Sequence, residues 1–219
     1  MSLFNDTYNR FAGKKVQRIE AISDGVFAVA LTLLVLDIKV PPTAGIKTET
    51  ELVAAFCALT PKLLTYFLSF MTLGIFWTGQ TAQYNFIEKS DRDLNWIALF
   101  FLLVVSLLPF TTAFLGEHFN FHFSVGLYWL NIFLLGLMLY IHWNYAYKNG
   151  YVTVPEAERS AINKAVRMRI ITAQCMYAAA ALLCFISNYL SIFIIIAIQL
   201  NYAFVFFRRR NKTSVHPKL

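Results

Sequence analysis

Long runs of apolar residues, separated by short polar breaks, repeat along this chain. Each run is close to the ~20 residues that an α-helix needs to cross a hydrocarbon core of about 30 Å. The pattern therefore predicts an all-α polytopic membrane protein with six transmembrane helices. We expect them over residues 18–40, 60–83, 94–115, 121–149, 156–186 and 188–208. In the fifth, only residues 170–186 are strongly apolar, and a short amphipathic helix over 50–59 precedes the second.

Prolines and a glycine mark several of the predicted helix ends. Pro41-Pro42 ends the first helix, because proline has no amide hydrogen and disfavours helix in the residue before it. Thr60 suits the N-cap of the second helix and Pro61 its first position, where no amide hydrogen is needed. Gly150 follows the fourth helix, since glycine readily takes the left-handed conformation that closes helices.

The composition supports the bilayer as the solvent of the chain. Of the 219 residues, 58% are hydrophobic and 14% are charged, and the mean hydropathy is +0.56. Soluble domains contain about 25% charged residues. We therefore expect one compact unit, with a cytoplasmic segment over residues 1–17, a transmembrane domain over 18–208 and a basic cytoplasmic tail over 209–219.

Lysine and arginine are unevenly distributed between the two ends of the predicted helices. Sixteen of the nineteen fall on one side, and only Lys39, Lys47 and Lys62 fall on the other. Short loops rich in these residues stay in the cytoplasm, so we expect both termini to be cytoplasmic. The net charge of +7 then reflects topology and anionic lipid. Nucleic-acid binding is not expected, because motifs that interleave basic and aromatic residues are missing.

The first predicted helix carries the polar residues of most interest, because charged groups inside apolar helices are costly and usually face protein or water. Ser23 and Asp24 lie toward its cytoplasmic end. At 100° per residue, Asp24 points about 140° away from Val29. The face around Val29 is a stripe roughly 100° wide. It contains Arg18, Ile22, Gly25, Val29, Thr32, Leu33, Leu36 and Val40.

This stripe has two interpretations. It can line a pore, with Ser23 and Asp24 holding the helix in place through hydrogen bonds. It can instead be one face of a packed helix that contains a single buried polar pair. Periodicity alone favours the packed helix, because an apolar stripe with one threonine is common in bundle cores. Thr32 can also donate to the Ala28 carbonyl of its own helix.

The sequence around Ser23 resembles the transmembrane protein 175 family, which comprises endolysosomal potassium channels and their bacterial relatives. The family motif Arg-x-x-x-Phe-Ser-Asp reads Arg18-x-x-x-Ile22-Ser23-Asp24 here. Similarity continues at residues 25–28, 32–36, 69–70, 76–77 and 109–111. The resemblance covers the first half of the chain, and the second half matches mainly in helix count.

The resemblance implies a homotetramer in a bacterial inner membrane, with four copies of the first helix around a potassium-selective pore. Potassium is then the permeant ion, the bilayer and further copies of the chain are the partners, and no cofactor is needed. Val29, Leu33 and Leu36 would form a hydrophobic constriction, and Thr32 would supply hydroxyl oxygens near the ion path. All four belong to the stripe. The Thr-Val-Gly-Tyr-Gly segment of conventional potassium filters does not occur in the sequence.

The same resemblance assigns structural roles to Arg18, Ser23, Asp24 and Trp77. Two positions depart from the family pattern. Ile22 replaces the motif phenylalanine, and Val29 is smaller than the isoleucine or leucine expected there. A smaller side chain predicts a wider or more easily wetted constriction, because hydrophobic gates work by excluding water.

The alternative function is a proton- or ion-coupled secondary transporter with Asp24 as the carrier. Such folds have repeats and broken helices near the midplane, which this sequence does not indicate. We expect no enzyme, because no nucleophile with a base in reach is recognisable. Glu117, His118 and His122 are close in sequence, but their spacing matches no known metal site, so a solvated loop is expected.

Other residues are expected to be structural. Cys57, Cys175 and Cys184 lie in apolar surroundings and are predicted to be small core residues. His142 precedes Trp143 near the inner end of the fourth helix and is predicted to anchor that helix at the membrane interface.

Overall fold

The computed structural model describes residues 16–42 and 45–213, and it describes side chains as far as residue 203. This part of the chain is helical, as the sequence predicts. The α-helices are α2 (Val16–Leu33), α3 (Glu49–Cys57), α4 (Thr60–Tyr84), α5 (Arg92–Glu117), α6 (His122–Lys148), α7 (Glu156–Leu182) and α8 (Asn188–Thr213). Two short 3-10 helices, η1 (Leu34–Asp37) and η2 (Leu183–Phe185), follow α2 and α7. The predicted segments 1–17 and 209–219 lie largely outside the described residues.

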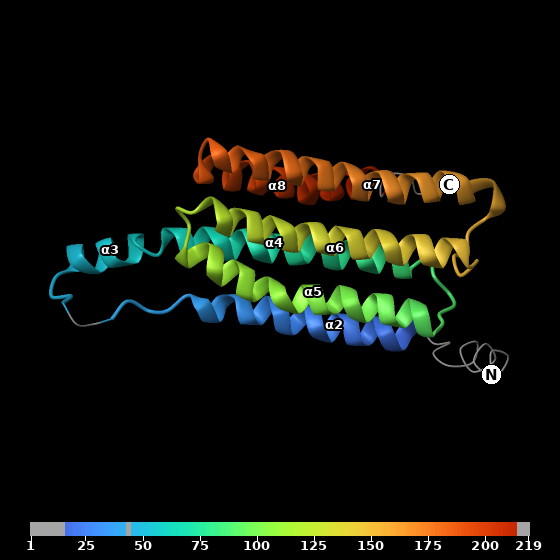
Figure 1. Cartoon of the computed structure of the whole chain (residues 1–219), viewed down its shortest axis with the longest axis horizontal. Helices are drawn as coiled ribbons and strands as arrows, with labels where there is room; N and C mark the ends of the chain where they lie inside the picture. Colours follow the sequence, from blue (N-terminus) through green and yellow to red (C-terminus); the bar gives the residue numbers. More distant parts are fainter. Residues whose placement is uncertain (1–15, 43–44, 214–219) are drawn as a thin grey trace.

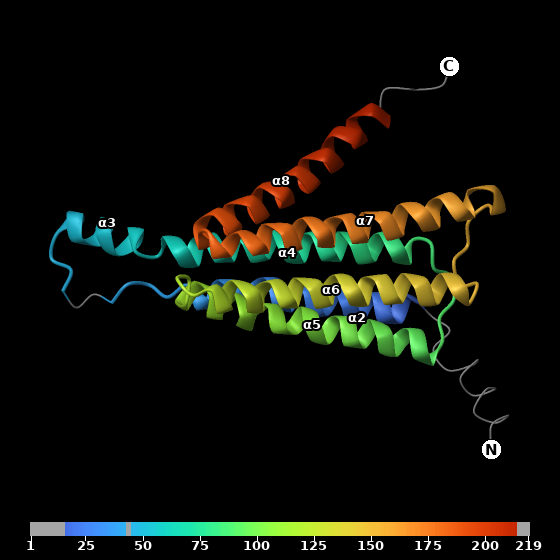
Figure 2. The same cartoon turned by 45° about the horizontal axis from the view of Figure 1, so that its top comes forward.

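The long helices form an elongated bundle in which successive helices run in opposite directions (Figure 1). The short helix α3 lies beyond the end of the bundle where α4 begins (Figure 1). Figure 2 shows α8 leaving the bundle at an angle, while α7 stays alongside α6. As a result, Val16 at the start of α2 and the far end of α8 lie toward the same end of the molecule.

Four helical segments are long and apolar enough to cross a membrane, and they identify an integral membrane protein. They are Val16–Asp37, Arg92–Glu117, His122–Lys148 and Glu156–Phe185. A fifth is possible if α3 and α4, which meet at an angle of 44°, act as one span. The apolar part of α8 among the described side chains, Asn188–Ala203, is shorter than these. The described residues thus support four or five spans by length and composition.

The first helix ends earlier than the sequence predicts. The α-helical part stops at Leu33 instead of Val40, and a 3-10 turn follows. Ile38 is already extended, with φ −83° and ψ 92°, and its amide donates to the Val35 carbonyl at 3.1 Å. Tightening to 3-10 geometry is a common way for a helix to satisfy its last carbonyls. The predicted stripe therefore keeps α-helical geometry only as far as Leu33, and Leu36 and Val40 lie beyond it.

Other predicted ends are closer to the observed ones. Gly150 follows α6 with a positive φ of 70°, the left-handed conformation expected for a residue after a helix. The helix α4 does begin at Thr60 with a proline in its first turn, but Leu59 occupies the cap position and makes no side-chain cap. The Thr60 hydroxyl instead donates to the Cys57 carbonyl at 2.6 Å, across the bend between α3 and α4.

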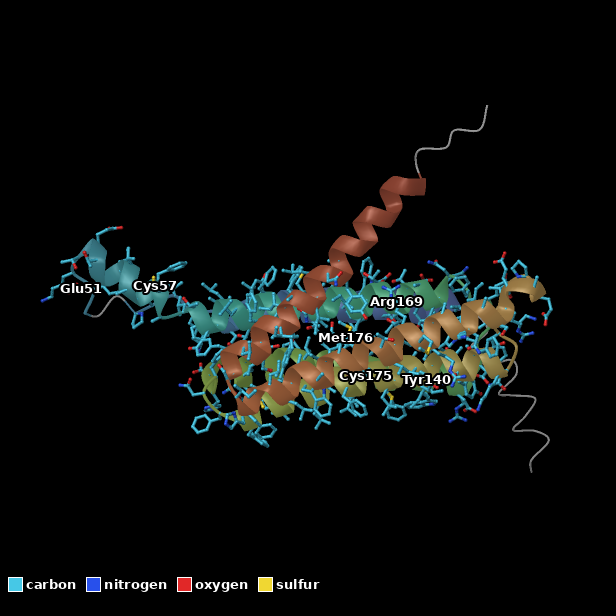
Figure 3. All side chains as sticks on the ribbon, turned by 90° about the horizontal axis from the view of Figure 1, so that it is seen from above. Glu51, Cys57, Tyr140, Arg169, Cys175 and Met176 are labelled. Atoms are coloured by element: carbon cyan, nitrogen blue, oxygen red, sulfur yellow. The ribbon has the colours of Figure 1, made fainter. Side chains whose placement is uncertain are left out.

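The prediction for the cysteines is correct at one position only. Cys184 is buried, whereas Cys57 and Cys175 are exposed on the isolated chain. Figure 3 shows Cys57 on α3, outside the bundle, and Cys175 on α7. An apolar sequence environment did not distinguish the core from the outer surface, because in a bilayer both are apolar.

A buried polar network ties four helices together in the core. The Tyr128 hydroxyl of α6 lies 3.1 Å from the Ser69 hydroxyl and 3.0 Å from the Thr72 hydroxyl, both on α4. Thr112 of α5 donates to Ser69 at 2.7 Å, and the Gln199 amide of α8 donates to Thr72 at 2.7 Å. All five residues are buried. Each of the five residues therefore has at least one hydrogen-bond partner inside the bundle, where no water replaces a lost hydrogen bond.

The loops at the opposite end of the bundle from α3 are joined by a short backbone contact. Ile87, after α4, forms an isolated antiparallel bridge with Val152, after α6. The Glu88 amide donates to the Tyr151 carbonyl at 3.1 Å, and the Thr153 amide donates to the Phe86 carbonyl at 2.9 Å. The two loops are thus held together as one strap.

A network centred on Asp91 adds side-chain contacts to this strap. One carboxylate oxygen caps α5 by accepting from the Leu94 amide at 2.8 Å. The other accepts from the hydroxyls of Tyr145 at 2.6 Å and Tyr151 at 3.0 Å. The cap of α5 is thereby linked to the end of α6 and to the following loop.

We predict that Tyr128→Phe lowers the free energy of unfolding by about 1–2 kcal/mol, the range for hydrogen bonds between membrane helices. The substitution keeps the ring but leaves Ser69 and Thr72 without their shared partner. Thermal denaturation of the purified protein in detergent measures the effect. Tyr66→Phe is the control, since the half-buried Tyr66 ring packs against Phe70. Equal midpoints for the two variants would contradict the prediction.

Candidate pore-lining helix

The helix α2 has one face against the bundle and one face that its own chain leaves open. Its packed face touches α4 and α5. The buried residues on it are Val16, Ile19, Ser23, Phe27 and Ala30, continued by Leu34. Their spacing of three and four residues is that of one helix face. Two faces of different character, expected from the sequence, are therefore present in the fold.

The predicted stripe coincides with the open face. All eight of its residues are exposed in the described chain. The exposed fraction is 57% for Val29, 44% for Leu33 and 69% for Leu36. Exposed apolar side chains in a row are a surface for lipid or for further copies of the chain. The alternative in which this stripe packs inside the bundle of a single chain is therefore wrong.

Thr32 lies on the open face with its hydroxyl turned back onto its own helix. The hydroxyl is 2.8 Å from the Val29 carbonyl and 3.1 Å from the Ala28 carbonyl. Because the proton is shared with these carbonyls, the lone pairs of the hydroxyl oxygen remain available as acceptors. An exposed hydroxyl oxygen of this kind can contact a cation while the helix keeps its hydrogen bonds.

Ser23 and Asp24 do different things, although they are adjacent in sequence. The buried Ser23 hydroxyl donates to the Ile19 carbonyl at 2.8 Å, so this bond stays within α2. Asp24 is exposed, and its carboxylate accepts from the Trp77 indole nitrogen of α4 at 2.8 Å. The hydrogen bond from Trp77 to Asp24 thus fastens α2 to α4 from the side. Arg18 is exposed on the open face.

The structure corrects the expectation for His142. Its ring is buried, and Nδ1 lies 2.9 Å from the side-chain oxygen of Gln83 on α4. The Gln83 amide nitrogen in turn donates to the Leu139 carbonyl at 3.0 Å. His142 therefore joins two helices in the interior instead of anchoring α6 at the membrane interface. The neighbouring Trp143 is buried as well, and its indole nitrogen donates to the Asn163 side-chain oxygen of α7 at 3.0 Å.

The residues considered for a metal site have other partners. Glu117 forms an ion pair with Lys62 at 2.5 Å, which links the end of α5 to the start of α4. His122 Nδ1 lies 3.0 Å from the Asn188 side-chain oxygen, and the His118 ring packs against Phe114. Among the described residues, no three histidine, cysteine or acidic side chains come together as a metal site. No sequence pattern indicated the Lys62–Glu117 pair, whose members are 55 residues apart.

Sequence comparison relates the first half of the chain to a known family. A sequence model described as the endosomal/lysosomal potassium channel TMEM175 matches residues 18–109. A protein of Streptomyces collinus named as a potassium channel is 33% identical over 174 residues, which are 78% of this chain and 82% of that protein. A second, from Chamaesiphon minutus and also named as a potassium channel, is 30% identical over 190 residues, 85% of this chain and 92% of that protein.

Structural comparison extends the likeness to the fold. The crystal structure of a lysosomal potassium-selective channel TMEM175 homolog from Chamaesiphon minutus matches with a TM-score of 0.73 and 29% identity. The match covers 86% of this chain and 96% of that one. The fold thus defines an α-helical integral membrane protein that is similar to ion channels of known structure. Together with the sequence matches, it shows that the chain belongs to the TMEM175 family.

We predict that Trp77→Phe lowers the free energy of unfolding by about 1 kcal/mol, because it removes the donor of an interhelical hydrogen bond. Asp24→Asn should have a smaller effect, since the amide oxygen still accepts. Asp24→Ala should cost little more once Trp77→Phe is present, and a double-mutant cycle measured by thermal denaturation in detergent tests this. Trp96→Phe is the control, because Trp96 is an exposed tryptophan on α5. Strictly additive losses would show that the two residues are not coupled.

Proposed function

We propose that the chain forms a homotetrameric channel that conducts potassium passively, with four copies of α2 around a central pore. The observation that carries this proposal is the row of exposed residues on α2, which begins at Arg18 and continues through Val29 and Leu33. In a tetramer, a second copy of α2 would cover part of this row, and the other residues of the row would face the pore. We propose no catalytic role for any residue.

Potassium as the permeant ion is supported by the names of the relatives and by the chemistry of the open face. Both bacterial relatives are named as potassium channels. Rings of Val29, Leu33 and Leu36 would narrow the pore and control its wetting. Thr32 would add hydroxyl oxygens on the same face. Leu36 follows the change to 3-10 geometry at Leu34. The four Leu36 side chains of a tetramer would therefore point in a different direction around the helix axis from those of Val29 and Leu33.

The membrane arrangement that we propose has six spans, with both termini in the cytoplasm of a bacterial cell and the protein in the inner membrane. The long helices alternate in direction, and α2 begins at the end of the bundle toward which α8 runs, which agrees with an even number of crossings (Figure 1). Among the side chains that the structure describes, most basic residues belong to segments at the end of the bundle opposite α3, and this end would be cytoplasmic. In this arrangement α8 crosses the membrane with residues beyond Ala203 included.

We predict passive potassium flux when the purified protein is reconstituted into liposomes, with a preference for potassium over sodium. Val29→Ala should increase the conductance, because a smaller ring lets water into the constriction more easily. Thr32→Ala should lower the preference for potassium, because a hydroxyl ring is lost from the ion path. Currents across a planar bilayer under a potassium–sodium gradient measure both effects. Val53→Ala, on the exposed helix α3, is the control and should change neither.

The same measurement separates a channel from a transporter that uses Asp24. Flux that saturates like a carrier, requires a counter-ion and is lost in Asp24→Asn while the tetramer yield is unchanged would contradict the channel. The hydrogen bond from Trp77 occupies one carboxylate oxygen of Asp24. It therefore favours a structural role, in which Asp24 fixes α2 against α4, over a role as an ion carrier.

We predict that Cys57 is labelled from outside the cell by a membrane-impermeant maleimide. The residue is exposed on α3, and the proposed orientation puts α3 on the outer side. Labelling of spheroplasts, followed by a mass-shift assay, measures this, and Cys57→Ser should abolish the signal. If Cys57 reacts only after the membrane is permeabilised, the orientation is reversed.

A further inference from the structure

A cavity of about 540 Å³ lies between α4, α6, α7 and the diverging helix α8. Its size is within the range of ligand pockets, about 300–1,000 Å³. The walls are largely apolar and include Ile75, Phe76, Leu139, Ile170 and Ala173. This cavity is separate from the open face of α2, which none of its lining residues belongs to.

One wall of the cavity carries a positive charge. Arg169 lines it from α7, and Figure 3 shows this residue in the angle between α7 and α8. The neighbouring Arg167 faces elsewhere and donates to the Tyr140 hydroxyl at 2.7 Å. Arg169 forms no ion pair with any acidic side chain in the part of the chain that the structure describes. Its guanidinium group is therefore free to bind an anion.

The position of Arg169 along α7 places this charge at the edge of the apolar segment. Residues 156–169 include six charged side chains, whereas none occurs in residues 170–186. Tyr202, which also lines the cavity, is similarly close to the end of the apolar part of α8 at Ala203. The cavity thus has a cation and a phenol close to the edge of the apolar segment. Its walls farther into the bilayer are mainly apolar, with Gln174 and Tyr177 as the polar exceptions.

We propose that this cavity binds an anionic phospholipid, with the phosphate on Arg169 and an acyl chain between α4 and α7. Charge complementarity selects an anion, because a guanidinium group binds phosphate through two parallel hydrogen bonds. The apolar walls select an amphiphile over a water-soluble anion, which would gain nothing from them. The lipid would come from the inner leaflet if the cytoplasmic side is the one given under the proposed function, and this assignment rests on that orientation. Occupancy itself does not depend on ion conduction.

Native mass spectrometry of the full-length protein in detergent tests the proposal. Phosphatidylglycerol is titrated against phosphatidylcholine with the same acyl chains, and retained lipid is counted. Phosphatidylglycerol should bind more tightly to the unmodified protein. Arg169→Gln should weaken its binding roughly fivefold, the effect of removing one basic residue beside anionic lipid. Arg167→Gln is the matched control, because it removes the same charge two residues away and leaves the cavity intact.

Two further measurements identify the occupant. Ala173→Phe should reduce lipid retention while Arg169 remains, because the added ring fills the apolar part of the cavity. Inorganic phosphate should neither displace the lipid nor raise the thermal stability as phosphatidylglycerol does. Equal binding of the two lipids, equal losses in Arg169→Gln and Arg167→Gln, or displacement by phosphate would each overturn the proposal. A channel that conducts normally without bound lipid would leave the proposed function in place.

Discussion

The contact that fixes the orientation of α2 is the packing of Phe27 against Phe101 of α5. The two rings lie 5.9 Å apart between centroids, and both residues are almost completely buried. Ala30 and Leu34 continue the same buried face along the helix. Each residue turns an α-helix by about 100°, so this contact also determines which side chains point away from the bundle. The open face with Val29, Thr32 and Leu33 exists because the opposite face is so firmly packed.

Polar residues inside the bundle determine how the helices are arranged against one another. In a bilayer, apolar packing alone distinguishes poorly between one helix arrangement and another, since lipid is as apolar as leucine. Directional hydrogen bonds among Tyr128, Ser69, Thr72 and Gln199 supply specificity that apolar contacts lack. The helices that these hydrogen bonds join can then hold α2 in a defined position.

Much of this architecture could be predicted from the sequence, because it follows from local patterns. Features that depend on contacts between distant residues could not be predicted. Most helix positions followed from apolar length and from Pro61 and Gly150, which act locally. The two faces of α2 followed from its periodicity. The end of α2 at Leu33 and the burial of His142 could not be predicted, because both depend on tertiary contacts. The link from Trp77 to Asp24 joins residues 53 apart, and only the fold brings them together.

The strap between Ile87 and Val152 has a mechanical consequence. It ties the hairpin of α4 and α5 to the hairpin of α6 and α7 by backbone hydrogen bonds. A displacement of one hairpin at this end of the bundle is therefore transmitted to the other. The beginning of α2 contacts the strap through side chains: Val16 and Ile19 pack in one buried cluster with Ile87 and Val152. Among the described residues, no backbone hydrogen bond joins α2 to the strap. A displacement of the strap would therefore reach α2 only through side-chain contacts of Val16 and Ile19.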